Sequence, residues 1–235
     1  MLDLLRTRLR QHIEPVAMPA DAAALPPRFR GRPAVRDASD AENRRSLPVI
    51  DLGRSVFAPE ELSEDDHGAA FTRDYRMATR TREALMTTGG ELALAAALDA
   101  RMRALLGRSL RLRSVAAGSC GGCEAELTAL GNVVFDMARF GVQFVASPRH
   151  ADGVVVSGIV SANMRDALEK TYNAVPDPKI VIAVGACAIS GGVFAGSPEA
   201  SGIPSSIPVD LWIPGCPPHP LTILDGLLRL LGRAT

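Results

Sequence analysis

The sequence predicts an α/β fold with a doubly wound parallel sheet in its C-terminal half. The first observation is a series of short, continuous apolar runs, which are typical of strands buried on both faces. The second is that these runs alternate with segments of helical periodicity, the pattern of parallel strands joined by right-handed helical crossovers. The third is a composition of 47% hydrophobic residues, which is enough to bury a core and excludes a wholly disordered chain.

Each element of this half is predicted from its own residues. Strands are expected where apolar and β-branched residues run together, and helices where apolar residues recur at helical spacing. The last helix also has early prolines, which suit a first helical turn because the missing N–H costs least there. The expected strands are 110–117, 142–145, 153–159, 179–184 and 209–213. The expected helices are 124–140, 164–172 and 217–231.

The N-terminal half differs in composition. Residues 1–110 carry 17 basic and 16 acidic residues, whereas residues 111–235 carry 9 and 10 and contain all four cysteines. Leucines and arginines alternate over residues 1–12, which predicts either a solvated terminal helix or a basic amphipathic helix that binds a membrane surface or a neighbouring subunit. Residues 82–107 read as helical around an interruption at two glycines. The expected divisions are an N-terminal helix and extended arm over 1–47, a charged module with a helical linker over 48–107, and the sheet domain over 108–235.

The composition argues against several classes of protein. Lys plus Arg and Asp plus Glu both number 26, so the basic surface typical of nucleic-acid-binding proteins is absent. No apolar run reaches the roughly 18 residues of a membrane span. No apolar segment with a small-residue cleavage site follows the N-terminus, so we expect a cytosolic location.

The four cysteines are expected to meet at one edge of the sheet. Each follows the end of an expected strand, and each lies within two residues of a glycine. The carboxyl ends of parallel strands share one edge, and ligand sites gather there. Thiols from three separate loops should therefore converge. The four residues are Cys120, Cys123, Cys187 and Cys216.

Four convergent thiols favour an iron–sulfur cluster, and two other readings stay open. The spacing is C-x2-C, then 63 residues to the third cysteine and 28 to the fourth, which a proline follows as in many cluster-binding runs. Tetrahedral zinc also accepts four thiolates, although only the first pair here is close in sequence. A thiol redox pair would use C-x-x-C alone and leave Cys187 and Cys216 unexplained. Disulfides are not expected in the cytosol.

The segments around these cysteines resemble a known family. They are similar to the small electron-transfer subunit shared by respiratory complex I and the energy-converting, membrane-associated NiFe hydrogenases, over about residues 108–232. The resemblance implies a flavodoxin-like fold with one 4Fe–4S cluster. Two glycines separate the first cysteine pair, which is adjacent in complex I, and this favours the hydrogenase side, including formate hydrogenlyase-type complexes. The similar segments are 119–127 (SCGGCEAEL), 147–158 (SPRHADGVVVSG), 176–192 (PDPKIVIAVGACAISGG) and 213–228 (IPGCPPHPLTILDGLL), and the implied ligands are Cys120, Cys123, Cys187 and Cys216.

This resemblance implies an oxidoreductase subunit that transfers electrons while chemistry takes place on a partner chain. The implied partners are a large hydrogenase-like or complex I-like catalytic subunit and further electron-transfer and membrane subunits, with no nucleic acid. The implied location is cytoplasmic and peripheral, on the inner face of the cell membrane through partner subunits. The alternatives are a zinc-stabilised assembly module without redox activity, a quinone-linked complex I-type subunit, and a free-standing thiol redox protein.

Several polar and aromatic residues are further candidates. Glu126 falls on an acidic position that the family shares, or is an exposed first-turn glutamate. Arg149 and His150 lie in a loop that the resemblance places near the cluster or the large subunit, or they bond to carboxylates. His219 either bonds near the cluster or lies at the surface, and Trp212 is expected in the core rather than as an electron relay.

Residues 49–62 and 69–85 resemble the ferredoxin-type module that accompanies such hydrogenase subunits. Where that module has cysteines, this sequence has Ser55, Ala58 and Glu61, none of which is a usual cluster ligand. We therefore expect either a degenerate module without iron or an unrelated charged extension. An iron content of about four per chain, rather than about eight, would agree with one cluster.

Overall fold

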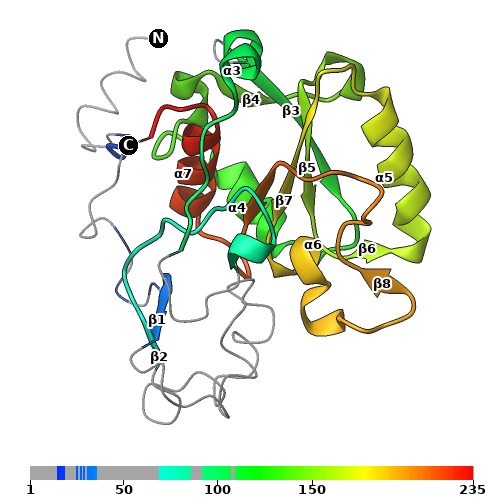
Figure 1. Ribbon diagram of the computed structural model, residues 1–235, viewed down its shortest axis with the longest axis horizontal. Helices are drawn as coiled ribbons and strands as arrows, with labels where there is room; N and C mark the ends of the chain where they lie inside the picture. Colours follow the sequence, from blue (N-terminus) through cyan, green and yellow to red (C-terminus); the bar gives the residue numbers. More distant parts are fainter. Residues whose placement is uncertain are drawn as a thin grey trace, which may run out of the picture.

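The computed structural model describes residues 15–18, 25, 27, 29, 31–35, 69–85, 92–106 and 109–234. Its centre is a five-stranded sheet in which all neighbouring strands are parallel (Figure 1). The order β4–β3–β5–β7–β9 is the 2-1-3-4-5 arrangement of flavodoxin-like folds, so the predicted fold class is confirmed. The strands are β3 (Leu110–Ala116), β4 (Val142–Phe144), β5 (Gly153–Ser157), β7 (Ile180–Val184) and β9 (Leu211–Ile213).

Helices cover both faces of this sheet. Helices α4 (Gly122–Ala129) and α7 (Pro220–Leu230) pack on one face of the sheet. The side chains of the even-numbered residues of β7 point to this face and belong to the same hydrophobic cluster. Helices α5 (Ala162–Ala174) and α6 (Ala186–Ser190) pack on the opposite face, and Figure 1 shows α5 and α7 on either side of the sheet. Every residue of β5 and β7 is buried, which explains why both strands read as unbroken apolar runs.

Smaller elements lie around this framework. Two pairs of short strands are antiparallel, β1 with β2 and β6 with β8. Helix α3 (Ala100–Leu106) precedes β3. The short strands are β1 (Pro33–Val35), β2 (Ala69–Phe71), β6 (Val160–Ser161) and β8 (Ala200–Ser201), and the 3-10 helices are η3 (Glu83–Leu85), η4 (Met137–Phe140), η5 (Pro148–His150) and η6 (Gly192–Phe194).

Residues 72–85, here called the strap, cover the outer edge of β9 and one side of α7. Thr79 forms an antiparallel bridge with Trp212 through two N···O hydrogen bonds of 3.0 and 2.9 Å. The strap also approaches α7 closely, because a Cβ on Gly226 would lie 2.8 Å from the Cβ of Ala78. The strap therefore closes one open edge of the sheet, where unpaired backbone groups would otherwise face outward. Trp212 is half-buried against the core beside α6, in agreement with the predicted core position.

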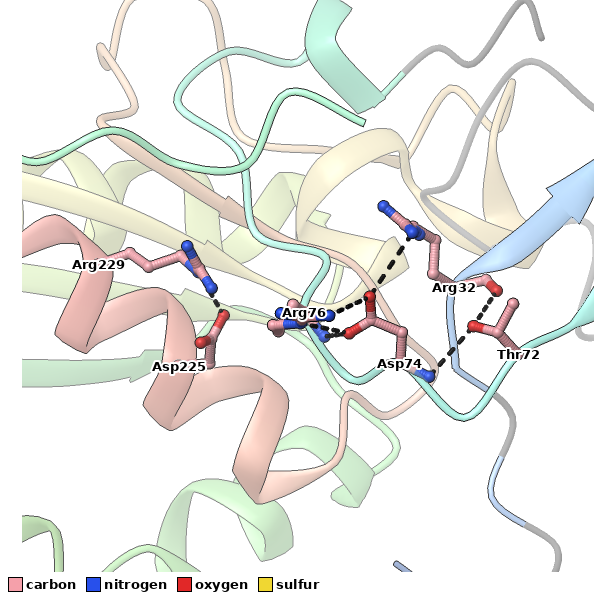
Figure 2. A network of polar contacts seen from close by, with 6 residues as sticks. All are labelled: Arg32, Thr72, Asp74, Arg76, Asp225 and Arg229. Atoms are coloured by element: carbon pink, nitrogen blue, oxygen red, sulfur yellow. Dashed lines mark hydrogen bonds and ion pairs between the residues drawn. The ribbon is translucent and has the colours of Figure 1, made fainter. Parts of the chain in front are cut away.

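A chain of charged side chains lies where the strap meets α7 (Figure 2). Asp225 and Arg229 of α7 form an ion pair of 2.8 Å, and their side chains are only 1% and 12% exposed. Burial raises the pKa of the Asp225 carboxyl, and the neighbouring Arg229 opposes this effect. In the strap, Asp74 pairs with Arg76 at 2.7 Å and with Arg32 at 3.6 Å. The pair between Asp74 and Arg32 connects the segment around Arg32 to the strap. The pair between Asp225 and Arg229 lies within α7, the helix that the strap covers.

The helix predicted over residues 124–140 is shorter in the structure. Helix α4 ends at Ala129, and the chain forms the separate 3-10 helix η4 further on. The side chain of Asn132 is the reason, because its Oδ1 accepts hydrogen bonds from the backbone N–H groups of Val134 and Phe135, at 2.9 and 3.1 Å. Asn competes in this way with helical hydrogen bonding. Val133, which lies within the predicted helix, is 44% exposed.

The helical segment predicted over residues 82–107 is also mostly different. Residues 92–99 are extended or irregular, and α3 begins only at Ala100. Their backbone bonds go to distant partners, since Ala95 N donates to Ala78 O at 2.7 Å and Leu98 N donates to Leu230 O at 2.9 Å. Tertiary pairing thus replaces local helix. The predictions for residues 1–12 and 49–62 lie outside the described residues, and the domain divisions stay predictions.

Candidate metal centre

The four cysteines lie beyond the carboxyl ends of three strands of the parallel sheet. Cys120 is in the loop after β3, and Cys123 is in the first turn of α4. Cys187 is in the first turn of α6, which follows β7, and Cys216 lies three residues after β9. All four are free thiols. The topology therefore brings them to the sheet edge where ligand sites of this fold class form.

Backbone hydrogen bonds join the loops that carry two of these cysteines. Gly185 N donates to Ile213 O at 2.9 Å, and the next residue, Ala186, donates its N–H to Gly215 O at 2.8 Å. The loop before Cys187 is thereby fixed to the loop before Cys216. The two thiols come from strands that are neighbours in the sheet.

Two glycines leave space that cysteine sulfurs fill. A Cβ on Gly185 would lie 2.6 Å from Cys123 Sγ, and a Cβ on Gly192 would lie 2.9 Å from Cys187 Sγ. Real Cβ atoms do not approach so closely, so each position admits only glycine while the sulfur stays in place. The short distance at Gly185 means that the thiol of Cys123, which follows β3 in sequence, lies against the loop that leads from β7 to Cys187.

The remaining thiol also lies close to a loop from another strand. A Cβ on Gly122 would lie 3.5 Å from Cys120 Sγ and 3.6 Å from Cγ of Pro217, the residue after Cys216. Cys120 is the exposed member of the four, whereas Cys123 is buried. The group of thiols is thus open on one side and enclosed on the other.

Burial and repulsion from neighbouring charges make Cys123, Cys187 and Cys216 hard to ionise in the absence of a cation. Burial is the largest cause that raises the pKa of Cys123 to about 12, and the charges of Glu124, Cys187, Cys216 and Cys120 contribute in that order. Burial raises the pKa of Cys216 to about 11, with smaller contributions from Cys187 and Cys120. Burial also raises the pKa of Cys187, followed by Cys120 and Glu124. The thiols therefore lie within each other's electrostatic field.

This donor set fits a group that is cationic and binds sulfur. Soft thiolates select zinc or iron–sulfur clusters, and either would offset the repulsion among four neighbouring thiolates. The glycines supply the room beside the sulfurs. Within the part of the chain that the structure describes, no group of three or more His, Cys, Asp or Glu side chains has the arrangement that would hold a metal ion. The assignment of the cysteines as ligands therefore stays a prediction.

His219, predicted either to bond near the cluster or to lie at the surface, caps a helix in the structure. It is the N-cap residue of α7, and its Nδ1 accepts a hydrogen bond from Leu221 N at 3.2 Å. The ring meets the rings of Phe29 and Phe135 edge-on, with centroids 5.4 and 6.0 Å away. Burial lowers its pKa. A neutral ring suits both contacts, because the cap requires an unprotonated Nδ1.

The other predicted polar residues are spread over the fold. Glu126 is half-buried in α4, and burial raises its pKa. Arg149 and His150 are exposed in η5, which leads into the amino end of β5. The cysteines follow carboxyl ends of strands in the same parallel sheet, so this loop lies at the other end of the strands. This differs from a position near the cluster, and the alternative position near the large subunit stays a prediction.

Sequence analysis passed over Glu124, the residue directly after Cys123. Its Oε2 accepts a hydrogen bond of 2.6 Å from Ser119 Oγ, and its Oε1 accepts one from Ser157 Oγ. Ser119 precedes Cys120, and Ser157 ends β5. The sequence did contain one indication of a role for Glu124, because this acidic residue directly follows the candidate ligand Cys123. Only the fold shows that Ser157 reaches it.

Comparison with known proteins matches the part of the chain that carries the cysteines. The model of the family described as NADH ubiquinone oxidoreductase, 20 Kd subunit, matches residues 120–230. The probable membrane-bound hydrogenase subunit mbhJ of Pyrococcus furiosus is 43% identical over 135 residues, which cover 57% of this chain and 81% of that protein. An NADH-quinone oxidoreductase subunit of Citrifermentans bemidjiense is 46% identical over 108 residues, which cover 46% of this chain and 64% of that protein.

Among solved structures, a chain of the membrane-bound sulfane sulfur reductase, an archaeal respiratory membrane complex, is 32% identical with a TM-score of 0.49. The match covers 56% of this chain and 73% of that chain. A chain of an NAD+-reducing [NiFe]-hydrogenase is 23% identical with a TM-score of 0.43, over 55% of this chain and 94% of that chain.

Proposed function

Because this chain belongs to the family of the NADH ubiquinone oxidoreductase 20 kDa subunit and is an oxidoreductase subunit, we propose that it carries one 4Fe–4S cluster and transfers electrons. The proposed ligands are Cys120, Cys123, Cys187 and Cys216. The observation that carries the proposal is the placement of the four cysteines beyond the carboxyl ends of three strands, where Cys123 Sγ lies against Gly185 and Cys187 Sγ lies against Gly192. A single centre that binds all four thiolates would account for this arrangement.

The chain's own residues would hold this centre rigidly. A 4Fe–4S cluster supplies one-electron transfer, with a potential set by burial, nearby charge and hydrogen bonds to sulfur. Burial of Cys123 excludes water on one side, while the exposed Cys120 leaves the other side open toward a partner. Gly185 and Gly192 let the backbone pass close to the sulfurs. Nothing in this role requires acid–base chemistry from the chain.

The proposed partner is a large catalytic subunit of a hydrogenase-like or complex I-like assembly, joined by further electron-transfer and membrane subunits. Two relatives bear the names of a membrane-bound hydrogenase subunit and of an NADH-quinone oxidoreductase subunit, which supports a place in a multi-subunit complex. The two glycines between Cys120 and Cys123 favour the hydrogenase type over the quinone-linked type.

The proposed location is peripheral, on the inner face of the cell membrane. The name of the hydrogenase relative supports association with a membrane complex. Over the described residues, no helix combines the length and the hydrophobicity needed to cross a bilayer. In this proposal, attachment runs through partner subunits.

Metal analysis of the full chain, purified without oxygen, tests the function. We expect about four irons and about four acid-labile sulfides per chain, with visible absorption that bleaches when dithionite is added. Single Cys→Ser variants at the four positions should each lose most of this absorption, because serine keeps the size but not the soft thiolate. One zinc per chain without iron would favour the assembly-module alternative. Alkylation of all four cysteines in the metal-free native protein would favour a thiol redox protein.

A further inference from the structure

Glu124 is a charged side chain that two hydrogen bonds hold beside the proposed ligands. It follows Cys123 in the first turn of α4, and its charge contributes to the raised pKa of both Cys123 and Cys187. Its two carboxylate oxygens each accept a hydrogen bond, one from Ser119 and one from Ser157. The carboxylate of this half-buried residue is therefore held between the ends of two strands.

The two serines come from different elements, and this fixes the carboxylate from two sides. Ser157 is completely buried at the end of β5, and Ser119 lies in the loop after β3. Strands β3 and β5 are neighbours in the sheet. Ser119 also accepts a hydrogen bond of 3.2 Å from Gly121 N, so the same network shapes the turn between Cys120 and Cys123.

We propose that Glu124 is a positioning residue that holds a fixed negative charge beside the cluster and lowers its reduction potential. This inference rests on the proposed function. A unit negative charge disfavours the addition of an electron nearby, and it does so more strongly when solvent is excluded. The two hydroxyl donors prevent the side chain from turning outward. Glu124 thereby sets how readily the centre takes an electron from a reductant.

Glu124→Gln separates the charge from the packing. Gln has nearly the same shape and still bonds to a serine, but it carries no charge. We expect the reduction potential, measured by EPR during titration with dithionite, to become more positive in this variant. At one fixed potential the ratio of reduced to oxidised centre should rise several-fold, where a tenfold rise corresponds to 59 mV for one electron. Glu124→Asp, which keeps the charge, should shift the ratio less.

A matched control removes a charge from the other face of the sheet. Glu169 lies in α5, so Glu169→Gln changes the net charge equally and should leave the potential unchanged. An equal shift in both variants would mean a general effect of net charge and would overturn the proposal. An unchanged potential in Glu124→Gln with a full complement of iron would also overturn it.

The serine donors provide a second route if Glu124→Gln loses its iron. The double variant Ser119→Ala and Ser157→Ala keeps the carboxylate but removes both hydrogen-bond donors. We expect the potential to rise because the freed carboxylate turns toward solvent, and an unchanged potential would overturn the proposal. Absence of any iron–sulfur signal in the unmodified protein would contradict the proposed function instead, so the two failures are distinguishable.

Discussion

Gly185 lies so close to the thiol of Cys123 that a Cβ at residue 185 would stand 2.6 Å from Sγ. The φ angle of Gly185 is +88°, a conformation that other residues rarely adopt. Gly185 also forms the turn between β7 and α6, which carries Cys187. One glycine therefore sets both the backbone path to one proposed ligand and the space for another.

We expect Gly185→Ala to abolish binding of iron, because the methyl group would displace the Cys123 thiol. The control is Gly196→Ala, because Gly196 also has a φ of +88° but no atom lies within 4 Å of its added Cβ. The control should suffer backbone strain of about 1–3 kcal/mol and keep its iron. The measurement is the iron content per chain of both variants. Retention of about four irons in Gly185→Ala would contradict the proposed site.

The buried ion pair on α7 predicts a large, pH-dependent effect of Arg229→Met. Without Arg229 the carboxylate of Asp225, which is 1% exposed, loses its nearest cation. Removal of one partner from a buried pair costs about 3–5 kcal/mol. Thermal unfolding of the full chain at neutral pH should reveal this loss.

The pH dependence follows from the carboxyl group left behind. Burial already raises the pKa of Asp225 above its ordinary value of 3.8, and loss of Arg229 removes a cause that lowers it. The folded state then binds the proton more tightly than the unfolded state, so the destabilisation should diminish as the pH falls toward 3.8. The control is Lys170→Met, since Lys170 pairs with Asp166 at the same i,i+4 spacing on an exposed surface. It should change the stability little at any pH, and a loss equal to that of Arg229→Met would contradict the argument.

We expect a second pH effect on stability from His219. Here stability is lost as the pH falls, which is the opposite of the effect expected for Arg229→Met. Burial lowers its pKa below the ordinary value of 6.5, so the unfolded state binds the proton more tightly than the folded state. Its contribution to stability is complete above pH 6.5 and is lost as the pH falls from 6.5 toward the folded-state pKa. His219→Asn keeps a side chain that caps helices well but does not titrate. The difference in melting temperature between the two proteins should therefore change across this range, and a constant difference would contradict the prediction.

Thr79→Pro should loosen the strap from the sheet. Proline removes the N–H that donates to Trp212 O and leaves that carbonyl without its partner, at a cost of about 1–3 kcal/mol. Hydrogen exchange should detect the loosening of the strap. The Trp212 amide donates to Thr79 O, so we expect this amide to exchange faster in the variant. The amides in the middle of β7 should keep their protection. Equal acceleration in both strands would indicate global unfolding instead.

The sequence predicts the parallel sheet well because its strands are buried on both faces. The runs 153–159 and 179–184 contain the observed β5 and β7, whose residues are all buried. The positions of the cysteines after strand ends follow from the same pattern, and the structure agrees with those positions. Whether the four thiols bind one centre stays a prediction.

The failures of prediction come from contacts between distant residues. Periodicity favours a helix through residue 140, but the side chain of Asn132 captures the next N–H groups. Residues around Ala95 look helical, but their N–H groups pair with the strap and with α7. Glu124 gains its surroundings from Ser157, 33 residues away. No local pattern contains these partners.

The bridge between Thr79 and Trp212 has a consequence for any attempt to isolate the cysteine-bearing region. The family match begins at residue 120, yet residues 72–85 form the outermost layer beside β9. A fragment cut at the start of the match would lose β3 from the sheet, and even one that began at β3 would leave the outer edge of β9 bare, which invites pairing with a second molecule. Such a fragment would be expected to aggregate even with every proposed ligand present, so failure to purify it would say nothing against the cluster.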